Sequence, residues 1–244
     1  MSNRSIHTLL KNWDEECPLT REEAVEVLNL PEEEMDSLME CAYALRTKYK
    51  GKKVSVQLLT NVRSGNCTQN CAYCAQSKDS QAEIEKYKRV SDEKLYGDND
   101  LVDEKHLARH CIGLSGIGFS DEEIEDLADR IREMKKKDTQ ICCSIGFLTE
   151  KQARILKDAG LDRINHNLNS SRSFYPEICT THTYDQRVNN IKMLQSLGFE
   201  ICSGGIVGMG ESKEDIVDML MDLREINPES VPINFLLQIV ISQS

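Results

Sequence analysis

From residue 54 onward, short apolar runs alternate with amphipathic segments, and this alternation restricts the fold more than any other feature. The runs have the length of strands, and the amphipathic segments carry apolar residues at helical spacing. Repeated strand–helix units favour parallel strands with right-handed crossovers. Strands are expected at Val54–Leu59, Cys111–Ser115, Gln140–Ile145, Arg163–Leu168, Glu200–Val207 and Val231–Leu237. The sequence therefore predicts an α/β barrel of six units, with its chemistry at the C-terminal ends of the strands.

Capping signals and periodicity divide the rest of the chain. Ser120 with Glu123 and Thr149 with Gln152 form capping boxes, which mark the starts of two helices. Residues 1–50 are polar and helical in pattern, so we expect an N-terminal helical extension followed by a barrel domain over residues 51–244. Residues 77–109 show neither the alternation of a strand nor the spacing of a helix clearly. A loop with some helix is expected there, with a turn at Tyr96–Asp100.

Composition narrows the classes of function. The formal net charge of -11 argues against binding DNA or RNA phosphates, which requires clustered Lys and Arg. No segment approaches the roughly 20 apolar residues of a membrane helix, and residues 1–16 lack the apolar core of a signal peptide. We therefore predict a cytoplasmic protein with no membrane or nucleic-acid partner. In a reducing compartment, its ten cysteines favour metal ligation or catalysis over disulfides.

The sharpest motif is a cluster of three cysteines just after the first predicted strand. Cys67, Cys71 and Cys74 have the spacing C-x3-C-x2-C, so their thiolates converge on one point. A zinc site would normally need a fourth Cys or His nearby, and none follows within a few residues. Three thiolates on a [4Fe–4S] cluster leave one iron open to a small molecule. Tyr73 would then shield the cluster.

The segment CTQNCAYC resembles the signature of the radical S-adenosylmethionine (SAM) superfamily. Five further segments resemble the biotin synthase family, in its order and over roughly residues 20–237: CAYCAQS, INHNLNSS, TTHTYDQR, CSGGIVGMGE and ESVPINFL. The resemblance implies a radical SAM barrel of the TIM type and conversion of dethiobiotin to biotin by sulfur insertion. It also implies a homodimer and a flavodoxin-type electron donor.

The resemblance assigns roles to individual residues. Cys67, Cys71 and Cys74 would carry the [4Fe–4S] cluster that binds SAM. Cys111, Cys142 and Cys202 would carry an auxiliary iron–sulfur cluster, either [2Fe–2S] or a variant. Because they lie on three different strands, they can meet only inside a closed barrel. The cofactor-binding residues would be Tyr73, Asn167, Asn169, Gly204, Ile206, Gly208 and Glu211, and the substrate-binding residues Asn165, Asn234 and Arg109.

A binding role for Asn165, Asn167 and Asn169 also follows from their spacing, independently of the resemblance. Asn165, Asn167 and Asn169 alternate along a predicted strand and its end, so they should share one face. Three inward amides in a barrel are costly unless they bind something polar. His166, between two of them, is expected to be a packed core residue rather than a ligand.

The sequence departs from the family at Cys143, at Cys179 and at its end. Both cysteines are additional and have no assigned role. The chain stops after the sixth strand and has no equivalent of the family's arginine ligand, which suggests a truncated barrel. Two alternatives stay open at this point. One is another radical SAM enzyme of the same subgroup, similar to a hydrogenase-cofactor maturase. The other is a truncated, non-catalytic iron–sulfur protein.

Overall fold

Parallel strands form the wall of the molecule. The computed structural model describes residues 18–237, and seven strands lie in that part of the chain. One five-stranded parallel sheet has the order β1-β2-β3-β4-β5, and a second sheet pairs β6 with β7. The single bridges Asn169–Gly205 and Cys202–Ser230 join the two sheets. The strands are β1 (Gln57–Arg63), β2 (Arg109–Leu114), β3 (Ile141–Ser144), β4 (Arg163–Asn165), β5 (Glu200–Cys202), β6 (Gly205–Val207) and β7 (Ile233–Phe235).

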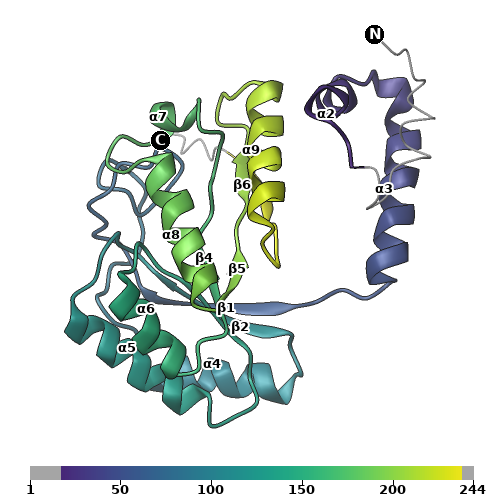
Figure 1. Cartoon of the computed structure of the whole chain (residues 1–244). Coiled ribbons are helices and arrows are strands. Elements are labelled where there is room, and N and C mark those ends of the chain that lie inside the picture. Colours follow the sequence, from purple (N-terminus) through teal and green to yellow (C-terminus); the bar gives the residue numbers. More distant parts are fainter. Residues whose placement is uncertain (1–17, 238–244) are drawn as a thin grey trace, which may run out of the picture.

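Helices cover the outer face of this wall, as Figure 1 shows. Ser120 and Thr149 each cap a helix through a capping box, as their sequence pattern predicts, and Ser212 caps a third helix in the same way. The helices after the strands are α4 (Asp92–Glu104), α5 (Asp121–Met134), α6 (Glu150–Asp158), α7 (Tyr175–Ile178), α8 (Tyr184–Ser196) and α9 (Lys213–Ile226). The α/β barrel prediction is confirmed, with β5 and β6 together forming its fifth strand.

The two faces of each strand have different surroundings. Ile112, Ile141, Ile164 and Ile201 are at most 1% exposed and pack in the core between sheet and helices. Their neighbours in sequence point to the opposite face, into the barrel, because side chains alternate along a strand. The inner face therefore receives polar residues and cysteines, and the outer face receives the apolar core.

Several predicted element boundaries were wrong. The first strand begins and ends later than expected, at Gln57 and Arg63. The expected turn at Tyr96–Asp100 lies inside α4. There Asp98 accepts hydrogen bonds from Thr60 and Lys94, so contacts with β1 stabilise a helix that Gly97 alone would weaken.

The N-terminal extension is helical where it is described. It comprises α2 (Arg21–Leu28), the short 3-10 helix η1 (Glu32–Glu34) and α3 (Met35–Lys50). Arg21 pairs with Asp218 of α9, whereas α3 has no buried residue and stands beside the barrel in Figure 1. Residues 1–17 of the predicted extension and residues 238–244 of the predicted barrel lie outside the described part. Within residues 18–237, no helix is long and apolar enough to cross a membrane.

The close passage of the chain at Gly204 gives a stability prediction. A Cβ atom there would lie 1.8 Å from the Pro232 carbonyl oxygen, so backbone would have to move. Gly204→Ala should lower the free energy of unfolding by about 1–3 kcal/mol, the usual cost of overpacking. Gly97→Ala is the control with the opposite sign. Its Cβ would meet nothing within 4 Å, and alanine should add about 0.5–1 kcal/mol in this helix. Denaturant midpoints measure both changes, and equal midpoints for the two variants would contradict the prediction.

Candidate functional site

A cavity of about 250 Å³ lies at the C-terminal ends of the strands. Its walls come from the loops after β1 to β4 and from the start of α8. Among the residues that border it are all three clustered cysteines, Tyr73, the three asparagines, His166, His182 and Arg187. The predicted radical cluster ligands and the predicted SAM-side asparagines therefore border one space, at the barrel end where the chemistry was expected.

The cysteine loop owes its shape to backbone turns and a few hydrogen bonds. Gly65 and Asn66 have positive φ angles of 72° and 53°, which turn the chain sharply at the end of β1. The Gly65 amide donates to Gln76 Oε1, and the Ala72 amide donates to the Ile178 carbonyl. These contacts fix the loop against α7. A cluster site needs this fixed loop because three ligands have to converge on it.

The three clustered thiols suit an iron–sulfur cluster better than a single ion. Burial raises the pKa of Cys71 to about 12 and also raises the pKa of Cys74. Buried thiols become thiolates when a metal offsets the cost. Among the described residues, the group whose ligand atoms all lie within 4.8 Å of one another is a different one, Cys71 with Cys179 and His182. The sulfur atoms of Cys67, Cys71 and Cys74 therefore do not all lie within 4.8 Å of one another, as expected of thiolates that bind separate irons.

Arg187 borders the candidate site and was not among the residues predicted from the sequence. It lies in α8 and borders the cavity, and its guanidinium hydrogen-bonds Tyr175 Oη, the Asn167 carbonyl and His182 Nε2. No carboxylate pairs with it among the described residues. A buried cation without a counter-ion favours an anion in the adjacent cavity. Its position in the segment TTHTYDQR was the only available signal.

The asparagine segment borders the cavity, although not as one continuous strand. β4 ends at Asn165, and Asn169 has a φ angle of 73°, so the expected alternation stops after Asn165. Asn167 Oδ1 accepts a hydrogen bond from the Gly204 amide, which holds it beside the neighbouring strand. All three asparagines still face the same cavity.

His166 is buried, as expected, at 2% exposure, and its ring packs edge-on against Phe147. Burial lowers its pKa to about 3, so the ring is neutral. Within the described chain neither ring nitrogen has a hydrogen-bond partner, yet the residue borders the cavity. An unpartnered buried polar group is expected where a ligand completes the hydrogen bonding.

A second constellation lies deeper in the barrel, on the inner faces of β2 to β5. Cys111 is in register with Cys142, and Asn165 with Cys202. Asn165 Nδ2 donates to Cys202 Sγ at 3.4 Å, and Cys111 Sγ lies 2.9 Å from Gln57 Oε1. Cys143 instead joins the outer core, as strand alternation predicts. The fold thus gathers the three predicted auxiliary ligands and separates Cys143 from them.

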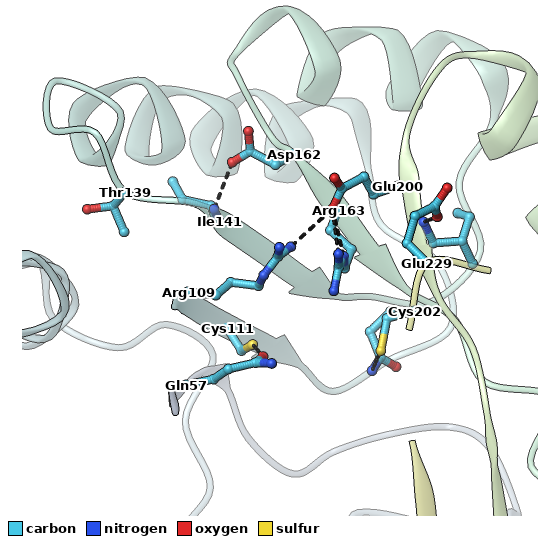
Figure 2. Close-up of polar contacts among 12 residues, drawn as sticks. Gln57, Arg109, Cys111, Thr139, Ile141, Asp162, Arg163, Glu200, Cys202 and Glu229 are labelled. Carbon is cyan, nitrogen blue, oxygen red and sulfur yellow. Dashed lines mark hydrogen bonds and ion pairs between the residues drawn. The ribbon is translucent and has the colours of Figure 1, made fainter. Parts of the chain in front are cut away.

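Two arginines lie beside these cysteines. Figure 2 shows Arg109 and Arg163 converging on the carboxylate of Glu200, with Cys111 and Cys202 nearby. The pKa of Cys111 lies below its ordinary value, because Cys142 donates a hydrogen bond to it and because both arginines attract the thiolate. Two guanidiniums and one carboxylate leave an excess positive charge, which suits an anionic group at the three thiols.

Other predicted residues do not border the 250 Å³ cavity. Glu211 accepts hydrogen bonds from the amides of Gly208 and Met209 and so shapes the turn after β6. Asn234 lies on β7, exposed and in register with Ile206. The roles predicted for Gly204, Ile206, Gly208, Glu211, Asn234 and Arg109 in binding stay predictions.

The chain is similar to proteins of known class. Residues 61–223 match the Radical SAM superfamily. The chain is 41% identical over 219 residues to biotin synthase of Geobacillus kaustophilus, covering 89% of this chain and 66% of that protein. It is 40% identical over 219 residues to biotin synthase of Bacillus subtilis (strain 168), covering 89% and 65%. The chain thus spans slightly less than two thirds of the length of these curated relatives.

Two solved structures share the fold at low sequence identity. Methylornithine synthase (PylB) superimposes with a TM-score of 0.83 at 17% identity, covering 95% of this chain and 67% of that one. The FeFe-hydrogenase maturase HydG from Carboxydothermus hydrogenoformans gives a TM-score of 0.80 at 19% identity, covering 96% and 57%. The superfamily match runs from β1 through α9 and includes the cysteine loop. On this match, the chain belongs to the radical SAM superfamily.

Proposed function

We propose that this chain carries the radical SAM core of a sulfur-inserting enzyme that converts dethiobiotin to biotin. The observation that carries the proposal is the presence of two separate cysteine sets in one barrel. Cys67, Cys71 and Cys74 border the cavity at its mouth, and Cys111, Cys142 and Cys202 lie together deeper inside. The similarity to biotin synthases at about 40% identity supports the same function. The maturase-like alternative has support from the fold alone.

A [4Fe–4S] cluster with SAM, bound at the mouth of the barrel, would supply the radical chemistry that removes hydrogen from an unactivated carbon. The chain's own residues bind and orient these groups. The three thiolates of the loop would hold the cluster, and Arg187 offsets negative charge beside it. Asn167 and Asn169 offer amides at the cavity wall, on the side where the resemblance expects the ribose of SAM.

The deeper constellation would supply sulfur. Cys111, Cys142 and Cys202 would hold the auxiliary cluster, and the excess positive charge of Arg109 and Arg163 over Glu200 would stabilise its thiolates. Asn165 lies between the two sites, since it borders the cavity and also contacts Cys202. A substrate held there would face the radical source on one side and the sulfur source on the other.

Anaerobic reconstitution tests the proposal directly. The full chain is loaded with iron and sulfide, reduced, and given SAM with dethiobiotin. We expect both 5′-deoxyadenosine and biotin. Formation of deoxyadenosine without biotin would indicate a radical SAM enzyme of another specificity. Absence of both products would support the non-catalytic alternative. A flavodoxin-type reductant and a homodimer, both implied by the resemblance, are tested in the same preparation by reductant exchange and sedimentation.

Asn234 gives a prediction about substrate recognition. If its amide hydrogen-bonds a cyclic urea, Asn234→Ala should weaken dethiobiotin affinity by roughly 10-fold, the value of one hydrogen bond of about 1.4 kcal/mol. The first cluster should be unaffected, so reductive SAM cleavage should continue. Isothermal titration with dethiobiotin measures the change. Asn227→Ala, at the C-cap of α9, is the matched amide control. Equal dethiobiotin affinity in wild type and Asn234→Ala would remove Asn234 from the substrate site.

A further inference from the structure

Cys179, which has no role in the proposed reaction, lies against one of the cluster cysteines. Its Sγ atom is 3.8 Å from Cys71 Sγ and 3.3 Å from His182 Nδ1. All three side chains are buried, and their ligand atoms lie within 4.8 Å of one another. Cys71 comes from the loop after β1, whereas Cys179 and His182 come from the loop between α7 and α8. The fold therefore brings two segments about a hundred residues apart to one point.

The spacing of these atoms matches the ligands of a single tetrahedral metal ion. With metal–sulfur bonds of about 2.3 Å, two thiolates on one tetrahedral ion lie about 3.8 Å apart. A thiolate and an imidazole nitrogen on such an ion lie about 3.5 Å apart. The observed distances of 3.8 Å and 3.3 Å are close to both values. This geometry differs from that of Cys67, Cys71 and Cys74, whose sulfur atoms do not all lie within 4.8 Å of one another.

We infer that Cys71, Cys179 and His182 form a mononuclear binding site for a thiophilic divalent cation such as Zn²⁺. The inference does not depend on sulfur insertion or on SAM cleavage. Two thiolates and one imidazole are a donor set that such ions prefer. Three protein ligands leave a fourth position, beside which lies the Gln69 carboxamide, with Oε1 3.0 Å from His182 Nδ1.

Neighbouring residues can orient the histidine for this role. Tyr175 Oη lies 2.8 Å from His182 Nε2 and can accept its N–H, which leaves Nδ1 free to bind the ion. The Arg187 Nη2 atom, 2.8 Å from Nε2, would then have to withdraw, while Arg187 Nε keeps its bond to Tyr175 Oη. Gln69 Oε1 would no longer accept a hydrogen bond from His182 Nδ1. This oxygen would turn toward the fourth position of the ion instead.

Charge balance allows the ion despite the nearby guanidinium. Binding replaces the protons of two thiols by one divalent ion, so two protons leave and the complex of ion, two thiolates and neutral imidazole has no net charge. It therefore adds no positive charge beside Arg187. Because Cys71 belongs to both donor sets, the single ion and the [4Fe–4S] cluster exclude each other there. An ion bound at this site would delay cluster assembly until it is removed.

Cobalt titration of the metal-free, reduced full chain under anaerobic conditions tests the site. We expect Co²⁺ to produce thiolate charge-transfer absorption and the visible bands of tetrahedral cobalt. Cys179→Ala and His182→Ala should each lose one molar equivalent of this signal relative to wild type. Cobalt on other cysteines appears equally in all variants and cancels in the difference. Cys143→Ala, another buried cysteine but outside the group, is the matched control and should retain the full signal.

The opposite pattern would overturn the site. If Cys179→Ala binds as much cobalt as wild type while Cys67→Ala or Cys74→Ala loses an equivalent, the ion binds the cysteine loop. A second measurement guards against a folding defect in the variants: X-ray absorption at the zinc edge of the wild-type chain with one equivalent of Zn²⁺. We expect two sulfur and at least one nitrogen ligand, and three or four sulfurs would contradict the inference. Failure to make biotin would change neither result, so the two proposals fail independently.

Discussion

Replacing Cys67 by alanine should abolish formation of 5′-deoxyadenosine by the reconstituted protein. With one of three thiolates missing, the cluster loses an anchoring iron–sulfur bond, and no other cysteine of the described chain is assigned to replace it. Cys67 gives a clearer test than Cys71, because Cys179 lies 3.8 Å from Cys71 and offers a substitute thiol. We expect complete loss of SAM cleavage, together with loss of the iron of one [4Fe–4S] cluster.

Chromatography of the reaction products and iron analysis measure the two effects. Cys41→Ala is the matched control, because Cys41 lies on α3 outside the barrel and should give wild-type deoxyadenosine and iron. If Cys67→Ala produces as much deoxyadenosine as wild type, the radical cluster is not held by this loop.

The parts of the site that the sequence predicted depend on local spacing. The cysteine loop is compact in sequence, and its three thiols border one cavity as expected. The placing of Cys111, Cys142 and Cys202 inside the barrel could also be predicted, because side chains alternate between the two faces of a strand. Cys142 and Cys143 illustrate this, since one lies beside Cys111 and the other in the outer core.

The parts that the sequence did not predict depend on contacts between distant segments. Arg109 and Glu200 are 91 residues apart, and nothing in their local pattern indicates that one carboxylate holds two arginines. Cys179 lies against Cys71, 108 residues away, and no local sequence pattern indicates this contact either. Gly204, between β5 and β6, lies against Pro232, which is another contact between segments distant in sequence.

Replacing Cys202 by alanine should separate the two reactions of the proposed enzyme. Cys202 lies beside Asn165 in the lumen and does not border the cavity that holds the cysteine loop. The variant should therefore keep the first cluster and still form 5′-deoxyadenosine. With one auxiliary ligand gone and the excess charge of Arg109 and Arg163 left unbalanced, the second cluster should be lost. Biotin formation should fall to zero, and iron content should fall by the share of that cluster.

Mössbauer spectra of wild type and Cys202→Ala measure the second cluster independently of turnover. Cys143→Ala is the matched control, since Cys143 neighbours Cys142 on β3 but faces the outer core, and it should retain both clusters and biotin formation. If Cys202→Ala keeps the full iron content and still makes biotin, the lumen thiols are packing residues and the sulfur-insertion proposal is wrong. If both wild type and variant hold only the first cluster, the arginine pair is not sufficient to hold an anionic group at these thiols.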